Sequence, residues 1–190
     1  MSPSEEIRPE VTTLGEAMAV LTPASRGALR GVRGFESGVG GAEVNVAVAL
    51  ARLGHLCGWY GHLGEDELGA AVSESLCAEG VDVSRVVRDP DNPTGLYLKE
   101  FRARDTLRVH YYRKDSAASR MSAEDSDLDW LLSSRIVHLQ ALPPFSPRAA
   151  TSWCAEWPGR PTSVESSFVS TPTSVNGCSE KETLRRRSLL

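Results

Sequence analysis

The chain has 190 residues, of which 41% are hydrophobic and 24% are charged, and its formal net charge at pH 7 is −4. This length is enough to bury a hydrophobic core, and the composition is ordinary for a globular domain. The slight acidity gives no electrostatic reason to expect nucleic acid as a partner. The dense basic run at 185–187 lies at the end of the sequence, where we interpret it as solvated.

The four cysteines lie far apart, with no Cys-x-x-Cys pair, and no histidine stands at zinc-ligand spacing. We therefore expect reduced thiols and no metal site. Residues 1–10 are polar and acidic, unlike the basic and apolar start of a signal peptide. No apolar run approaches the roughly 20 residues that a membrane helix needs. These features predict a soluble, cytoplasmic protein with no membrane partner.

Hydrophobic periodicity, glycine and proline positions and helix caps divide the chain into short elements. Up to residue 79, the predicted elements in chain order are strands at 11–14 and 18–21, a loop at 23–34, a helix at 42–53, a strand at 56–62 and a helix at 66–79. An extended segment at 81–87 and a hairpin of strands at 96–101 and 106–112 follow. The last predicted elements are a helix at 122–132 capped by Ser122, a strand at 136–139 and a further helix from about 146.

Strand and helix alternate after residue 40, which predicts an α/β fold with a parallel sheet flanked by helices. The strands before residue 38 and the 96–112 hairpin do not fit this alternation. We expect them to form a small second sheet that stands off the main one.

The glycines before the 42–53 helix are the first candidate for a binding site. Glycine lets a ligand approach the backbone, and a helix N-terminus offers free N–H groups next to Gly41. Asn45, one turn into the helix, can donate and accept hydrogen bonds, which suits sugar hydroxyls. A plain tight turn with Asn45 in solvent explains the same pattern.

The second candidate is the end of the hairpin, where alternation places Tyr111 and Arg113 on one face and Tyr112 on the other. A guanidinium beside a tyrosine hydroxyl suits the carboxylate of a sugar acid. An ordinary surface strand with a flanking charge is the competing interpretation.

Longer runs carry a family resemblance. Gly-Gly-Ala-Glu-Val-Asn-Val-Ala-Val-Ala-Leu-Ala-Arg-Leu-Gly at 40–54 and Gly-His-Leu-Gly-Glu-Asp-Glu-Leu-Gly at 61–69 resemble the N-terminal signature of PfkB (ribokinase-type) carbohydrate kinases. Within that family, Ala-Glu-Val-Asn-Val-Ala, the strand from Gly95 and the run Tyr111-Tyr112-Arg113-Lys114 are most similar to 2-keto-3-deoxygluconate kinase. The resemblance covers about residues 11–150.

The resemblance implies a Rossmann-like ribokinase fold over residues 11–160, with a β-sheet lid made from residues near 12–22, 32–39 and 95–112. It implies a lid that covers a sugar and pairs with a second subunit's lid in a homodimer. Asp115 stands where the sugar-acid kinases have glycine. The implied sugar contacts are Gly41, Asn45, Tyr97, Tyr111 and Arg113, with Glu16 where many members have a sugar-binding aspartate.

The family reaction, transfer of the γ-phosphoryl group of ATP to a sugar hydroxyl, uses Mg²⁺ and an aspartate base in a Gly-Ala-Gly-Asp motif. Neither that motif nor the Asn-x-x-Glu motif tied to magnesium occurs in the 190 residues. We therefore assign no catalytic, nucleotide-binding or metal residue, and expect the chain to be truncated and inactive alone.

The Ser- and Thr-rich residues 161–176 lack amphipathic periodicity, so we interpret 161–190 as an irregular tail. The family's Asp-x-Asn-x-Arg motif is missing there, which suggests that about 161–178 is translated out of frame. Three further interpretations stay open: a fructokinase or ribokinase relative, a non-catalytic sugar-binding or lid-dimerisation module, and an unstable pseudogene product.

Overall fold

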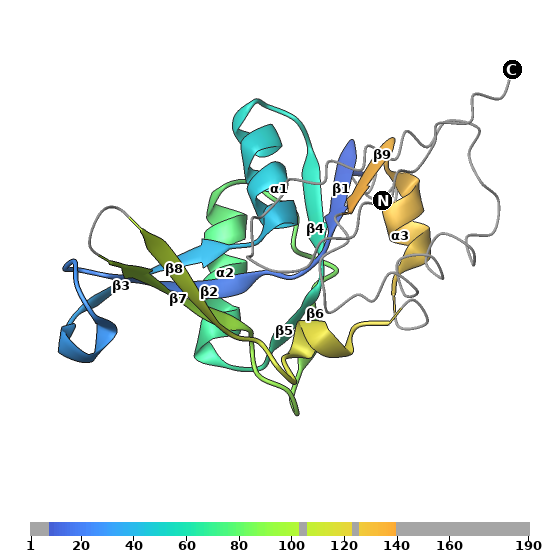
Figure 1. Ribbon diagram of the computed structural model, residues 1–190. Helices are drawn as coiled ribbons and strands as arrows, with labels where there is room; N and C mark the ends of the chain where they lie inside the picture. Colours follow the sequence, from blue (N-terminus) through green and yellow to red (C-terminus); the bar gives the residue numbers. More distant parts are fainter. Residues whose placement is uncertain (1–7, 103–105, 123–125, 140–190) are drawn as a thin grey trace, which may run out of the picture.

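The computed structural model describes residues 8–102, 106–122 and 126–139, and its centre is a three-stranded parallel sheet (Figure 1). Strand β1 (Val11–Leu14) lies between β4 (Cys57–Tyr60) and β9 (Ile136–Leu139), and both pairings are parallel. Every residue of β1 and β4 is buried, as expected for parallel strands covered on both faces. The predicted α/β architecture is confirmed.

Two adjacent aromatic residues of β4 anchor the cores on the two faces of this sheet. Neighbouring side chains in a strand point to opposite faces, so Trp59 and Tyr60 are buried on different sides. The Trp59 core contains residues of α1 (Ala42–Arg52) and α2 (Glu67–Ala78), namely Val44, Ala47, Val72 and Leu76. The Tyr60 core contains Leu14, Met121 and two residues of α3 (Leu128–Ser133), Trp130 and Leu131.

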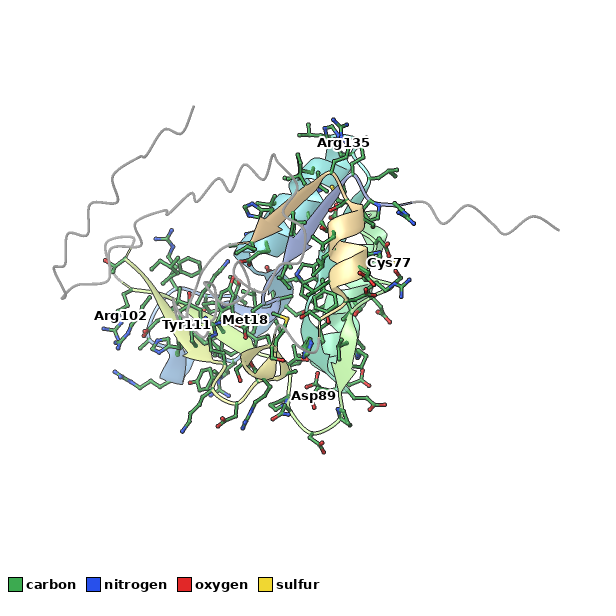
Figure 2. The ribbon with its side chains drawn as sticks, turned by 90° about the vertical axis from the view of Figure 1, so that its right-hand side faces the viewer. Met18, Cys77, Asp89, Arg102, Tyr111 and Arg135 are labelled. Atoms are coloured by element: carbon green, nitrogen blue, oxygen red, sulfur yellow. The ribbon has the colours of Figure 1, made fainter. Side chains whose placement is uncertain are left out.

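A second sheet of four strands stands off the central sheet, and we call it the lid (Figures 1 and 2). Its strand order is β3 (Phe35–Gly40), β2 (Met18–Pro23), β7 (Leu96–Phe101) and β8 (Leu107–Tyr112). The β2–β7 pair is parallel and the other two pairs are antiparallel. In Figure 2, Met18 lies near its base and Arg102 at its outer end. The predicted second sheet is confirmed, and a short 3₁₀-helix, η1 (Leu29–Gly31), interrupts the loop between β2 and β3.

Two predictions about the strands were wrong. Residues 12–14, assigned to the lid, belong to β1 of the central sheet, because this fully buried strand pairs with β4 and β9. The strand expected at 56–62 divides at Gly61, and β5 (His62–Gly64) pairs instead with β6 (Val87–Asp89). A Cβ atom on Gly61 would lie 2.6 Å from the carbonyl oxygen of Gly15. Only glycine therefore lets these two segments of the backbone pass so closely.

The helix predicted at 122–132 with Ser122 as its cap was also wrong. The chain forms a 3₁₀-helix, η3 (Ala117–Arg120), and α3 begins only at Leu128. The cap of α3 is Asp127, whose side-chain oxygen accepts a hydrogen bond of 3.0 Å from the backbone N–H of Trp130. Because aspartate and serine cap helices about equally well, the cap nearer the apolar run determined the start.

Asp66 joins the start of α2 to the start of the lid. It caps α2 as predicted, since its Oδ1 accepts a hydrogen bond from the Gly69 N–H at 2.7 Å. The same carboxylate accepts bonds of 2.8 Å from both the backbone N–H and the hydroxyl of Thr94. Burial opposes ionisation, but the bonds from Thr94 and Gly69 and the nearby Arg88 outweigh it and hold the pKa of Asp66 below its usual range.

We expect Asp66→Ala to lower the free energy of unfolding by about 2 kcal/mol, because a helix cap and two further hydrogen bonds are lost. The depressed pKa makes this contribution complete above the ordinary aspartate pKa of 3.8 and progressively lost as the pH falls through the lower folded value. Urea denaturation between about pH 7 and pH 3 measures both effects. The control is Asp91→Ala, an exposed carboxylate in the loop that carries Thr94; an equal loss in both variants would contradict the assignment.

Candidate functional site

A buried ion pair lies where the central sheet meets the lid. Glu16, in the three-residue connection between β1 and β2, is 7% exposed. Its Oε2 is paired with Nη2 of Arg113, which follows the last residue of β8. Its Oε1 accepts a hydrogen bond of 3.1 Å from the buried hydroxyl of Ser116. Two segments about 100 residues apart in sequence therefore meet at one carboxylate.

The environment of Glu16 disfavours its charge despite these partners. Burial raises the pKa of Glu16, and the charge of Arg113 and the bonds from Ser116 and Arg113 only partly offset this effect. The Arg113 side chain is 22% exposed, so it is not fully closed off from a ligand. Arg113 can donate five N–H groups, and one carboxylate cannot use them all.

Glycines allow the backbone to approach this ion pair closely. A Cβ atom on Gly41 would overlap the carbonyl oxygen of Glu16, and one on Gly95 would lie 2.6 Å from Glu16 Oε1. Gly40 is likewise closed by the hydroxyl of Tyr97. The predicted Gly41 and Glu16 are thus in contact, and the side-chain-free backbone around them is a real packing requirement.

Two tyrosines form the lid surface beside the glycines. Tyr97 of β7 and Tyr111 of β8 are directly opposed, with ring centroids 5.6 Å apart and planes inclined by 47°. Burial, and then the neighbouring Tyr111, raise the pKa of Tyr97, so its phenol is neutral at physiological pH. The predicted pair offers aromatic faces together with hydroxyl groups that can donate and accept hydrogen bonds.

Asn45 lies apart from this group. It is exposed and lines a cavity of about 330 Å³ with residues of α1, α2 and β3, including Arg52 and Glu79. Neither Gly41 nor Arg113 lines that cavity. Val39 of β3 does line the cavity. Its neighbour Gly38 pairs with Val20, and Val20 pairs with Tyr97, so Gly38 and Tyr97 lie on the same face of the lid. Alternation therefore puts the cavity on the opposite face of the lid from Tyr97, and the predicted role of Asn45 stays a prediction.

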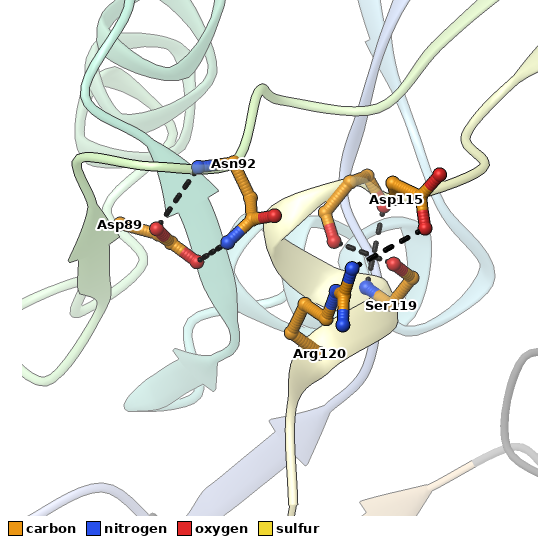
Figure 3. Close-up of polar contacts among 6 residues, drawn as sticks. Asp89, Asn92, Asp115, Ser119 and Arg120 are labelled. Atoms are coloured by element: carbon orange, nitrogen blue, oxygen red, sulfur yellow. Dashed lines mark hydrogen bonds and ion pairs between the residues drawn. The ribbon is translucent and has the colours of Figure 1, made fainter.

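The turn after β8 is built around Asp115 (Figure 3). Asp115 has φ of 59°, the one non-glycine residue with positive φ among those the structure describes. Its carboxylate lies 3.4 Å from Nη2 of Arg120, an exposed pair that contributes little to stability. Aspartate therefore holds a left-handed conformation in which glycine is not strained.

Comparison with known proteins decides the family. The pattern of the pfkB family carbohydrate kinases matches residues 8–157. The chain belongs to the PfkB carbohydrate kinase family. Over 136 residues it is 43% identical to the 2-dehydro-3-deoxygluconokinase of Bacillus subtilis. The matched region is 71% of this chain but only 42% of the relative.

Solved PfkB structures confirm the ribokinase-type fold. A PfkB protein from Polaromonas sp. superimposes with a TM-score of 0.70 at 40% identity, over 76% of this chain and 49% of its own. A sugar kinase from Pyrococcus horikoshii, determined in complex with ATP, gives a TM-score of 0.64 at 30% identity, over 68% of this chain and 42% of its own. The chain thus spans less than half the length of each of these three relatives.

Magnesium, which the PfkB resemblance implies, finds no ready site in the described residues, because they contain no cluster of three or more His, Cys, Asp or Glu side chains arranged for a metal ion. We therefore assign none of the described residues to a magnesium ion. The described helices are also all too short or too polar to cross a membrane.

Two residues of the candidate site were not predicted from the sequence as functional groups. Ser116 contacts Glu16, and Gly95 makes room for it. Gly95 begins the strand that carries part of the family resemblance, but no sequence pattern links Ser116 to a carboxylate 100 residues earlier. The Asp66–Thr94 contact, which fixes the start of β7, was missed for the same reason.

We expect Asp115→Gly to raise the free energy of unfolding by about 1 kcal/mol, because glycine relieves the left-handed backbone. Thermal or urea unfolding measures the change. Asp91→Gly is the matched control, since Asp91 is exposed and does not have positive φ; there the added backbone freedom should lower stability. A loss of stability in both variants would show that the side chain of Asp115 is the more important contribution.

Proposed function

We propose that this chain carries the sugar-binding part of a kinase that transfers the γ-phosphoryl group of ATP to a hydroxyl of 2-dehydro-3-deoxygluconate (2-keto-3-deoxygluconate). The observation that carries the proposal is Arg113, a partly exposed arginine at the base of a lid that also presents Tyr97 and Tyr111. Planar guanidinium groups bind carboxylates well, and a sugar acid has both a carboxylate and hydroxyls.

Each candidate residue has a separate proposed role. Arg113 binds the sugar carboxylate, while Tyr97 and Tyr111 pack on the sugar and hydrogen-bond its hydroxyls. Gly41 leaves the backbone open to the ligand. The proposed hydrogen bond from Asn45 to a sugar hydroxyl requires its side chain to turn out of the cavity that it lines on the other face of the lid. Glu16 acts on the sugar through Arg113, since its two oxygens are already engaged with Arg113 and Ser116.

In the proposed reaction a sugar hydroxyl oxygen forms a bond to the γ-phosphorus of ATP, the bond to the bridging oxygen breaks, and ADP leaves. The hydroxyl proton passes to a general base. The 190 residues contain no Gly-Ala-Gly-Asp run, so we assign that base to none of them. The chain's own residues bind and orient the sugar and shield it from water. Cytoplasmic ATP makes the cytoplasm the proposed location.

Isothermal titration calorimetry tests the sugar assignment. We expect 2-dehydro-3-deoxygluconate to bind the wild-type chain and Arg113→Ala to weaken that binding about a hundredfold, because one charge-assisted contact is worth roughly 1.5–3 kcal/mol. Fructose and ribose are the uncharged controls and should respond little to the variant.

Tighter binding of fructose or ribose than of the sugar acid would favour a fructokinase or ribokinase instead. A folded chain that binds none of these sugars would contradict the proposal. Sugar binding without turnover by the 190 residues identifies a sugar-binding module, whereas measurable phosphorylation overturns the expectation of inactivity.

The lid is also the proposed contact surface for a second copy of the chain. Its two edge strands carry the exposed residues Phe35, Leu107, Tyr111 and Tyr112. Unpaired edges with large apolar side chains favour association. We expect a dimer in sedimentation equilibrium that Leu107→Lys weakens, whereas Leu53→Lys, at an exposed site on α1, does not. A wild-type monomer at high concentration would contradict this proposal.

A further inference from the structure

The guanidinium of Arg113 already holds a carboxylate, and that carboxylate belongs to the chain itself. Resting on the proposed function, we propose that Glu16 is an internal counter-ion that occupies part of the anion-binding edge of Arg113, so that it limits the affinity of the site for carboxylates and prevents small anions from filling it. Glu16 is then a specificity-determining residue and not a sugar ligand.

The geometry fixes Glu16 in this role from three sides. Its Oε2 pairs with Arg113, and its Oε1 accepts the hydrogen bond from Ser116 at 3.1 Å. Gly95 lies so close that a Cβ atom there would be 2.6 Å from Oε1. With only 6% of its side chain exposed, Glu16 cannot move into solvent without rearranging β7 or the turn after β8.

The pair is formally neutral, which determines how a ligand carboxylate experiences it. An anion that approaches Arg113 is attracted by the guanidinium and repelled by the Glu16 carboxylate a few ångströms further on. Both interactions act in a partly buried region, where charges are screened less than in water. Hydroxyl and keto groups of a sugar carry no net charge, so Glu16 affects their binding far less.

Glu16 also holds Arg113 in place, and this opposing effect has to be weighed. Losing the carboxylate would let the arginine side chain explore more rotamers, which disfavours binding. Coulomb interaction between charges at ion-pair distance in a protein is larger than the entropy of one side chain. Glutamine keeps the length and one acceptor oxygen, so it retains part of the positioning. We therefore expect the electrostatic effect to dominate.

The burial that disfavours the charge of Glu16 supports a neutral replacement. Burial raises the pKa of Glu16 even with Arg113 beside it. Glu16→Gln keeps the shape of the side chain and removes its desolvation cost, but it leaves Arg113 without its counter-charge, so the folding of the variant has to be measured. Glu16→Met, which has a similar length and no charge, provides a second variant if Glu16→Gln does not fold.

The decisive experiment is calorimetric titration of folded wild type and Glu16→Gln with 2-dehydro-3-deoxygluconate, fructose and acetate. We expect Glu16→Gln to bind the sugar acid at least about tenfold more tightly, a change of about 1.4 kcal/mol. Fructose affinity should change by less than about twofold, and acetate binding should appear in Glu16→Gln only. Circular dichroism and thermal unfolding check that each variant is folded.

Two controls separate a local effect from a general one. Glu79→Gln makes the same change in net charge and also frees an arginine, since Glu79 is paired with Arg52 at 2.5 and 2.7 Å on the surface. It should leave acetate and sugar-acid binding unchanged. Adding Arg113→Ala to Glu16→Gln should abolish the gained anion binding.

The outcomes keep the two proposals apart. Weaker binding of the sugar acid by Glu16→Gln would show that Glu16 only positions Arg113 and would overturn the counter-ion role. A gain in Glu79→Gln would move the anion site to the cavity beside Asn45 and overturn it as well. If the wild type binds no sugar acid but Glu16→Gln gains acetate binding through Arg113, the counter-ion role holds and the proposed substrate fails.

Discussion

The ion pair between Glu16 and Arg113 is the contact that joins the two sheets at the candidate site. Glu16 belongs to the connection that leaves the central sheet, and Arg113 to the end of the lid. A buried charge is tolerated only with a partner and hydrogen bonds, and Arg113 and Ser116 supply both. Gly95 leaves room for the carboxylate and Gly41 for the backbone of Glu16, so these two glycines follow from the position of one residue.

The fold could be predicted from the sequence to a large extent, because its signals are local. Small apolar residues at helical spacing before Gly54 predicted α1, and the acidic cap Asp66 predicted α2. The hairpin of β7 and β8 and its separation from the parallel strands were also expected. The helix before β9 was misplaced because two caps of equal strength, Ser122 and Asp127, competed.

The site was predictable only as a set of residue types. Tyr97 and Tyr111 were expected together, and the structure opposes them across the hairpin. Glu16, however, was expected where many family members have a sugar-binding aspartate, whereas its oxygens are engaged with Arg113 and Ser116. A contact that spans 100 residues has no periodic signal in one sequence. Family membership supplied the chemistry that periodicity could not, since the PfkB pattern covers residues 8–157.

The short connection between β1 and β2 has a mechanical consequence. Only residues 15–17 separate a strand buried in the central sheet from the second strand of the lid. These residues form one of the segments that tether the lid, so any swing of the lid over a bound sugar has to change their conformation, and the charged side chain of Glu16 lies there. Ligand binding and lid movement therefore depend on the same residue. A change in the charge at residue 16 would also change how readily the lid moves.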